Sequence, residues 1–195
     1  MKRLNIFLFF LLSAIAEPAL SQSSNGNPDF GDVDIVSFRI NGALNLNPSC
    51  DDEKIGGGAG ADVEWRFVPR VGIGLGAGYS SEMAHIETAW RIVEGAYGAS
   101  KHDQRLSFIN VPLRLYVHPT DWLTLDAGIQ WSYVADKGSV KGLSRTCWSV
   151  PFGVCFGSKY HLFLRYQPRL GNMMESNGNG EVKSSPLSIG FGIKI

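Results

Sequence analysis

The chain has 195 residues, enough for one domain, and its 18 Lys and Arg residues balance 18 Asp and Glu residues. This balance argues against a nucleic-acid partner, which would require a basic surface. The 23 glycines often lie inside alternating segments, where glycine weakens an ordinary soluble strand.

Residues 1–21 have the pattern of a secretory signal peptide. A short basic start precedes the apolar run Ile6–Leu12, and Ala19-Leu20-Ser21 places small residues at the cleavage positions. The apolar run is too short to cross about 30 Å of hydrocarbon as a helix. We predict cleavage before Gln22 and a flexible lead-in over residues 22–35.

The rest of the chain consists mainly of segments in which apolar and polar residues alternate. Gln104–His118 is the clearest, because every second residue from Ile109 to Val117 is apolar. A period of two is typical of a β-strand with two unlike faces. In chain order we predict eight such strands, over residues 36–47, 58–68, 70–81, 104–118, 122–135, 146–156, 160–169 and 185–195.

The predicted connections alternate between long and short. Tight turns fall at Pro69, Pro119-Thr120 and Ser158, and the longest connection runs from Glu82 to Asp103, where continued alternation predicts a hairpin that extends beyond the membrane. Transmembrane barrels combine short periplasmic turns with longer extracellular loops. Aromatic residues near strand ends match the girdles at the two membrane interfaces.

These patterns predict an all-β fold, an eight-stranded antiparallel up-and-down transmembrane β-barrel over residues 36–195 in the outer membrane. The alternatives are a soluble barrel of lipocalin type and a secreted β-sandwich, which expose their polar face to water. Here that face is crowded with glycine and other small residues, which suits a barrel interior better than a solvent surface.

The inward face carries charges, and an eight-stranded interior is only wide enough for side chains to fill it. Buried charges must then be paired. The turn at Pro69 sets Asp62 near Gly76, Glu64 near Gly74 and Arg66 near Gly72. We also expect Arg39 near Glu64 and Arg114 near Asp126. The predicted interior charge network comprises Arg39, Asp62, Glu64, Arg66, Arg114, Asp126, Arg165 and Lys194, and it predicts a lumen closed to solutes.

The three cysteines, Cys50, Cys147 and Cys155, fit no zinc or CxxC spacing. An exported protein can form disulfides. Cys50 and Cys147 are both predicted at the long-loop end, whereas Cys155 lies about 26 Å from Cys147 along an extended strand. We therefore predict a disulfide between Cys50 and Cys147.

The sequence contains no pattern that predicts catalysis, a cofactor or a metal site. No carboxylate is spaced to orient any of the four histidines as a triad requires. Asp51-Asp52-Glu53 is interpreted as a solvated acidic loop rather than a cation site. Gly56-Gly57-Gly58 lacks the lysine and the helix of a phosphate-binding loop. We predict that the protein is not an enzyme.

The segment Phe108-Ile109-Asn110-Val111-Pro112-Leu113-Arg114-Leu115-Tyr116 resembles a motif of small outer-membrane β-barrel proteins of the PorT-like type. In that motif an aromatic, an aliphatic and a polar residue precede an aliphatic-Pro-Leu run. The terminal Ile193-Lys194-Ile195 is similar to that family as well. The resemblance implies an outer-membrane barrel, and some members of the family are linked to protein secretion.

Two classes of function follow from this fold. The first is a structural or interaction scaffold that displays extracellular loops, as part of a protein-secretion or envelope assembly. The alternative is a small pore for ions or small solutes. The expected partners are outer-membrane lipid and envelope or secretion-system proteins, without nucleic acid, and we expect a monomer in the membrane.

Overall fold

The computed structural model describes residues 35–50, 55–91, 97–138, 142–173 and 180–195. The predicted signal peptide and all but the last residue of the predicted lead-in lie outside these ranges. Every regular element in them is a β-strand. Among these residues, none belongs to a helix long and apolar enough to cross a membrane.

The strands, in chain order, are β1 Val36–Leu46, β2 Ile55–Val68, β3 Val71–Arg91, β4 Tyr97–Thr120, β5 Leu123–Asp136, β6 Thr146–Ser149, β7 Phe152–Phe156, β8 Tyr160–Tyr166, β9 Arg169–Leu170, β10 Gly180–Lys183 and β11 Leu187–Lys194. Their bounds follow the segments in which polar and apolar residues alternate. β6 with β7, and β8 with β9, correspond to the sixth and seventh predicted strands, each in two parts, and β11 corresponds to the eighth. β10 lies in a segment predicted as a loop, so that part of the prediction is wrong.

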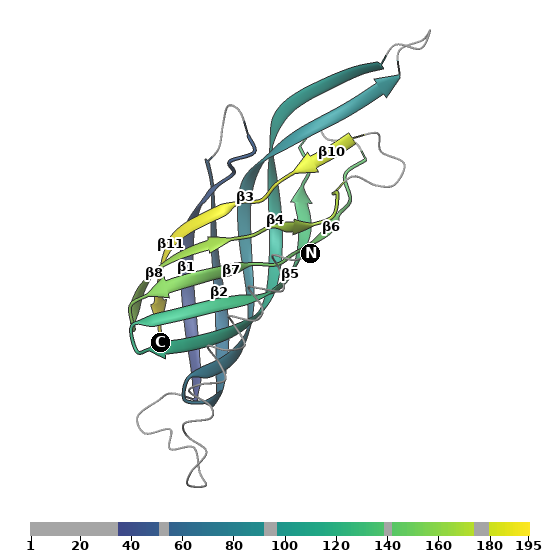
Figure 1. The fold of residues 1–195 in the computed structure, drawn as a ribbon. Coiled ribbons are helices and arrows are strands. Elements are labelled where there is room, and N and C mark those ends of the chain that lie inside the picture. The colour runs from purple at the N-terminus through teal and green to yellow at the C-terminus, as the bar shows by residue number, and fades with distance from the viewer. Residues whose placement is uncertain (1–34, 51–54, 92–96, 139–141, 174–179) are drawn as a thin grey trace.

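The sheet closes on itself (Figure 1). Neighbours in the chain pair antiparallel from β1 to β5, then β5 pairs with β6 and β7, β7 with β8, and β8 with β11. β11 pairs with β1 from Leu187–Leu46 to Lys194–Arg39 and completes the ring. The predicted eight-stranded antiparallel barrel is therefore confirmed.

Prolines interrupt each of the last three barrel strands. Proline has no N–H to give to the ladder, yet each of these prolines still accepts a backbone hydrogen bond through its carbonyl. The donors are Gly128 N to Pro151 O at 2.9 Å, Val150 N to Pro168 O at 3.0 Å and Gln167 N to Pro186 O at 3.0 Å. The three breaks thus bond to neighbouring strands, so the barrel wall remains continuous there.

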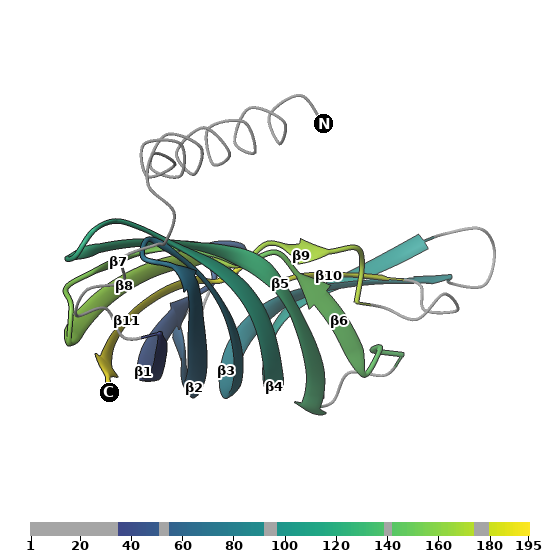
Figure 2. The same cartoon turned by 90° about the horizontal axis from the view of Figure 1, so that it is seen from below.

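β3 and β4 continue as a long hairpin beyond the rest of the barrel (Figures 1 and 2). They stay paired as far as Arg91 and Tyr97. The stretch predicted as the longest connection is therefore mostly strand, because its alternation is that of a hairpin rather than a loop. β10 pairs with β3 over residues 85–88 and supports the base of the hairpin.

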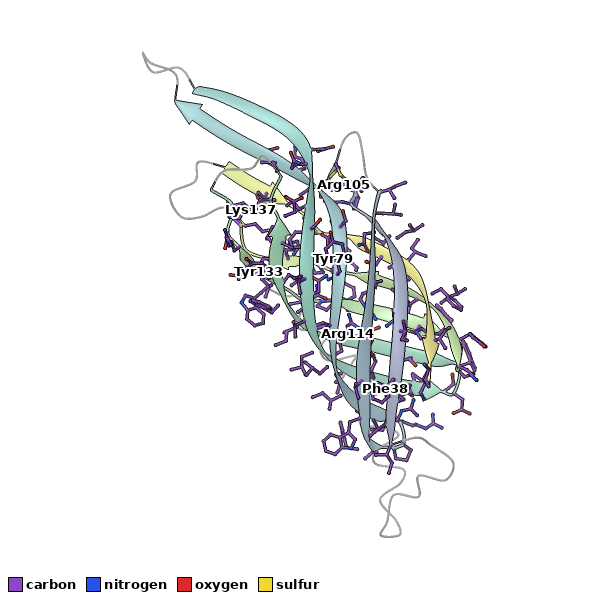
Figure 3. The ribbon with its side chains drawn as sticks, turned by 180° about the vertical axis from the view of Figure 1, so that it is seen from behind. Phe38, Tyr79, Arg105, Arg114, Tyr133 and Lys137 are labelled. Carbon is purple, nitrogen blue, oxygen red and sulfur yellow. The ribbon has the colours of Figure 1, made fainter. Side chains whose placement is uncertain are left out.

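The two faces of the barrel differ as the alternation predicts. Large apolar side chains stand on the outside, with Phe38 56% and Leu162 62% exposed, while charged inward residues such as Glu64 are buried. Figure 3 labels Phe38 toward one end, Arg114 about half-way along and Arg105 near the base of the hairpin. An apolar exterior around a polar interior is the arrangement of a barrel solvated by lipid.

Candidate functional site

The lumen nearest the short turns is organised around Glu64, whose side chain is fully buried. The Glu64 carboxylate accepts hydrogen bonds from Arg39 Nη2 and, at 3.0 Å, from Arg66 Nε. His118 Nε2 lies 2.6 Å from Glu64 Oε1, and the other ring nitrogen lies 2.9 Å from Thr124 Oγ1. One carboxylate therefore holds two guanidinium groups and an imidazole together.

Two further carboxylates fill the middle of the lumen. Asp126 receives a bidentate pair of hydrogen bonds from Arg165, at 2.9 and 3.1 Å. Asp62 accepts from the Tyr116 hydroxyl at 2.8 Å. Arg114 lies between them, 3.7 Å from Asp62 Oδ2 and 3.9 Å from Asp126 Oδ1. Bidentate pairs of this kind fix side-chain geometry as well as neutralising charge.

Glycines on β3 make room for these groups. The register across Pro69 is the predicted one, with Asp62 opposite Gly76, Glu64 opposite Gly74 and Arg66 opposite Gly72. A Cβ on Gly72 would lie 2.7 Å from Glu64 Oε1, and a Cβ on Gly74 would lie 2.5 Å from Tyr116 Cε2. The glycine-rich inner face is therefore the space into which the charged and aromatic side chains of neighbouring strands fit.

A layer of neutral polar groups separates this network from a second ion pair near the long loops. Hydrogen bonds run from Ser132 to Asn110 at 2.7 Å and from Asn110 to Ser80 at 2.8 Å, and Ser80 donates to Glu82 at 3.1 Å. Glu82 also accepts from Arg169 Nη2 at 2.7 Å. The Arg169 guanidinium lies 4.1 Å from the centre of the Phe108 ring.

An apolar cluster fills the long-loop end above that ion pair. Strand residues and residues from two loops contribute to it: Ala84, Ile86, Leu106, Phe108, Val134, Leu143, Cys147, Met173 and Val182, all less than 10% exposed. We call this set the apolar plug. Leu143 and Met173 lie outside the strands, so two of the loops cover the mouth rather than leaving it open.

All but one of the predicted network residues lie in these contacts. Arg39, Glu64 and Arg66 form one group, and Asp62, Arg114, Asp126 and Arg165 form the other. Lys194 lies opposite Arg39 in the register and lines a cavity at the end of the barrel instead. The energetic importance of the network is tested by the substitutions described below.

Sequence reasoning missed Glu82, Arg169 and the central role of His118. Glu82 has the inward parity of Ser80, so following the alternation past residue 81 would have found it. Arg169 is separated from Arg165 by an even number of positions, so the alternation places both on the inward face although Pro168 interrupts the strand. The alternation could not predict the apolar plug, because its residues occupy inward positions that are polar elsewhere in the barrel.

Thr124, His118 and Glu64 form a hydroxyl–imidazole–carboxylate chain, an order that nucleophilic enzymes use. In such enzymes the carboxylate stabilises the imidazolium that forms when the hydroxyl loses its proton. Glu64 is already bonded to two guanidinium groups, which compensate its negative charge. The arrangement therefore favours a structural role for this chain of contacts.

No disulfide forms between the cysteines, all of which are described and buried. The Cys147 sulfur accepts a hydrogen bond from Arg169 Nη1 at 2.9 Å, and the Cys155 thiol lies 3.7 Å from Asp126 Oδ2. The Cys50–Cys147 bond predicted for the oxidised protein is thus not formed here and stays a prediction. Mass spectrometry of non-reduced protein is expected to leave only Cys155 alkylatable, and alkylation of Cys50 would contradict the pairing.

The described part of the chain has no group of three or more His, Cys, Asp or Glu side chains placed to hold a metal ion.

Residues 7–194 match the family described as outer membrane protein beta-barrel domain. No curated protein matches the sequence.

Among solved structures, the outer membrane protein Ail of Yersinia pestis in a phospholipid nanodisc is similar at 12% identity, with 82% of this chain and 99% of that chain covered and a TM-score of 0.47. A de novo designed transmembrane β-barrel has 10% identity, coverage of 82% and 95%, and a TM-score of 0.44. Ail in complex with the heparin analogue sucrose octasulfate has 11% identity, coverage of 82% and 96%, and a TM-score of 0.41.

Proposed function

This chain belongs to the outer membrane protein β-barrel domain family, and from that premise we propose that it is a closed scaffold that displays its long hairpin outside the cell. The strand connections support this orientation, because short turns face the periplasm and longer elements face outward in such barrels. The N-terminal signal peptide is part of the proposal, as the route by which the chain reaches the outer membrane.

The main support for the proposal is that side chains fill the lumen. Charge pairs occupy its middle, and the apolar plug occupies the end under the long loops. A cavity of about 90 Å³ remains in mid-lumen, bordered by Asn45, Asn110 and Arg165. Such a space holds a few water molecules at most. The filled interior favours a scaffold over the alternative of a small pore.

The surface offered to a partner is the hairpin. β5 pairs with β4 only from Ser107 onward, so within the described residues no strand lies beside β4 over 97–102 on that side. An unpaired strand edge can accept an extended segment of another protein. We propose an envelope or secretion-system protein, in the manner of PorT-like barrels, as the partner, and a non-enzymatic role. Crosslinking from the hairpin in intact outer membranes would capture it.

Conductance tests the scaffold proposal against the pore. The purified protein in planar lipid bilayers is expected to show no steady conductance, because charge pairs and the apolar plug fill the lumen in the part of the chain that the structure describes. A general porin measured in the same bilayers is the positive control. A steady conductance of porin size in the wild-type protein would contradict the proposal and establish the pore.

A further inference from the structure

A cavity of about 520 Å³ lies at the short-turn end of the barrel, the end at which the C-terminus lies in Figure 1. The turns between β2 and β3, β4 and β5, and β7 and β8 line it, together with the end of β11 and inward residues of the barrel floor. Its volume is within the range of about 300–1,000 Å³ found for small-molecule sites. Neither the charge network nor the scaffold role accounts for this cavity.

The lining of the cavity is strongly cationic. Five basic side chains border it, Arg39, Arg66, Arg70, Lys159 and Lys194, against one acidic side chain, Asp121. The nearby Glu64 carboxylate is fully buried and already bonded to Arg39 and Arg66, so it compensates at most one of these charges. Among the side chains that line the cavity, basic groups therefore outnumber acidic ones.

Two of these side chains have hydrogen-bond donors that a ligand can use. The Arg66 guanidinium uses only Nε within the described residues, on Glu64, which leaves its two terminal nitrogens without a partner there. Lys159 is exposed; its carbonyl accepts a hydrogen bond from Lys194 N at 2.8 Å, and its ammonium group extends from the turn between β7 and β8. Hydroxyl groups of Thr120 and Ser158 also border the cavity. Guanidinium and ammonium donors around one space are suited to a phosphate group, which offers several acceptor oxygens.

The cavity lies at the depth of lipid headgroups. Trp65, Phe156 and Tyr160 are about half exposed on the outer wall at this end of the barrel, as expected for the aromatic girdle of one membrane interface. Phosphate groups at that depth have two sources, soluble periplasmic phosphate compounds and the headgroups of anionic phospholipids. Both present the same chemistry to the cavity.

We propose that this cation-lined cavity binds a phosphate-bearing anion. The inference goes beyond the scaffold role, and it stands or falls separately from the conductance result. Arg66 and Lys159 donate to the phosphate oxygens, and Arg70 adds charge at the rim. Arg39 holds the floor through Glu64.

Pyrophosphate binding to the detergent-solubilised mature protein, measured by isothermal titration calorimetry, tests the proposal. The double variant Arg70→Gln/Lys159→Gln is expected to weaken binding about tenfold or more, since two charged contacts are lost. Both residues are exposed turn residues, and the single variant Lys159→Gln provides the test if the double variant does not fold. Arg105→Gln/Arg145→Gln is the charge-matched control at the opposite end, where binding stays as in the wild type.

Absence of wild-type binding, or equal weakening in both double variants, would overturn the proposal, since the second result indicates general charge attraction. Native mass spectrometry of protein released from vesicles of phosphatidylcholine and phosphatidylglycerol then distinguishes the two sources. A phosphatidylglycerol molecule retained by the wild type and lost from Arg70→Gln/Lys159→Gln identifies a lipid headgroup. Binding of added pyrophosphate alone identifies a soluble phosphate compound.

Discussion

Replacement of Glu64 by Ala is expected to destabilise the barrel by about 3–5 kcal/mol, the usual cost of leaving buried charges without their partner. Arg39 is 5% exposed and the Arg66 side chain 12% exposed, so water cannot solvate either guanidinium fully once the carboxylate is gone. His118 loses its partner as well. The free energy of unfolding is measured in urea with lipid vesicles present.

Glu87→Ala is the control for this substitution. The Glu87 side chain is 31% exposed and lies 3.6 Å from His85 Nε2, outside the charge network, so we expect its removal to cost about 0–1 kcal/mol. Glu64→Gln keeps the shape of the side chain but loses its charge, so we expect an intermediate effect. Equal stability of the Glu64→Ala and Glu87→Ala variants would mean that the interior is wet and the charges are solvated.

Replacement of Phe108 by Ala in the apolar plug is expected to cost about 3–5 kcal/mol, as truncation of a buried aromatic residue usually does. The ring is completely buried and lies under the Arg169 guanidinium. Its loss leaves a cavity and removes the cation–π contact, which is worth about 2 kcal/mol when desolvated. The same urea unfolding measurement reports the change.

Ile109→Ala is the matched control, one residue further along β4 on the opposite face. Ile109 is 45% exposed and faces outward, so lipid chains fill the space left by the substitution. The expected cost is about 2 kcal/mol at most, from about 0.8 kcal/mol per buried CH₂. If Ile109→Ala proved as destabilising as Phe108→Ala, the plug would contribute no more than the lipid-facing surface.

Local pattern was sufficient to predict the barrel and much of its inner wall. A strand has a period of two, so each inward residue could be assigned from parity alone, and a tight turn fixes the register of the two strands it joins. The opposition of Glu64 to Gly74 across Pro69 follows from these two rules. The alternation past residue 81 predicts the extended hairpin that β3 and β4 form, but Glu82 was missed because the predicted strand ended at residue 81.

The sequence by itself determined the β-barrel class, the inward and outward faces and the residues that carry charge in the lumen, because these depend on periodicity within single strands. The expected proximity of Arg39 to Glu64 and of Arg114 to Asp126 is present in the structure. Only the tertiary structure decided the other partners: His118 reaches Glu64, Arg165 binds Asp126, and β10 crosses to pair with β3. The apolar plug and the cationic cavity join residues far apart in the chain, and such contacts depend on the closure and tilt of the whole barrel rather than on any local pattern.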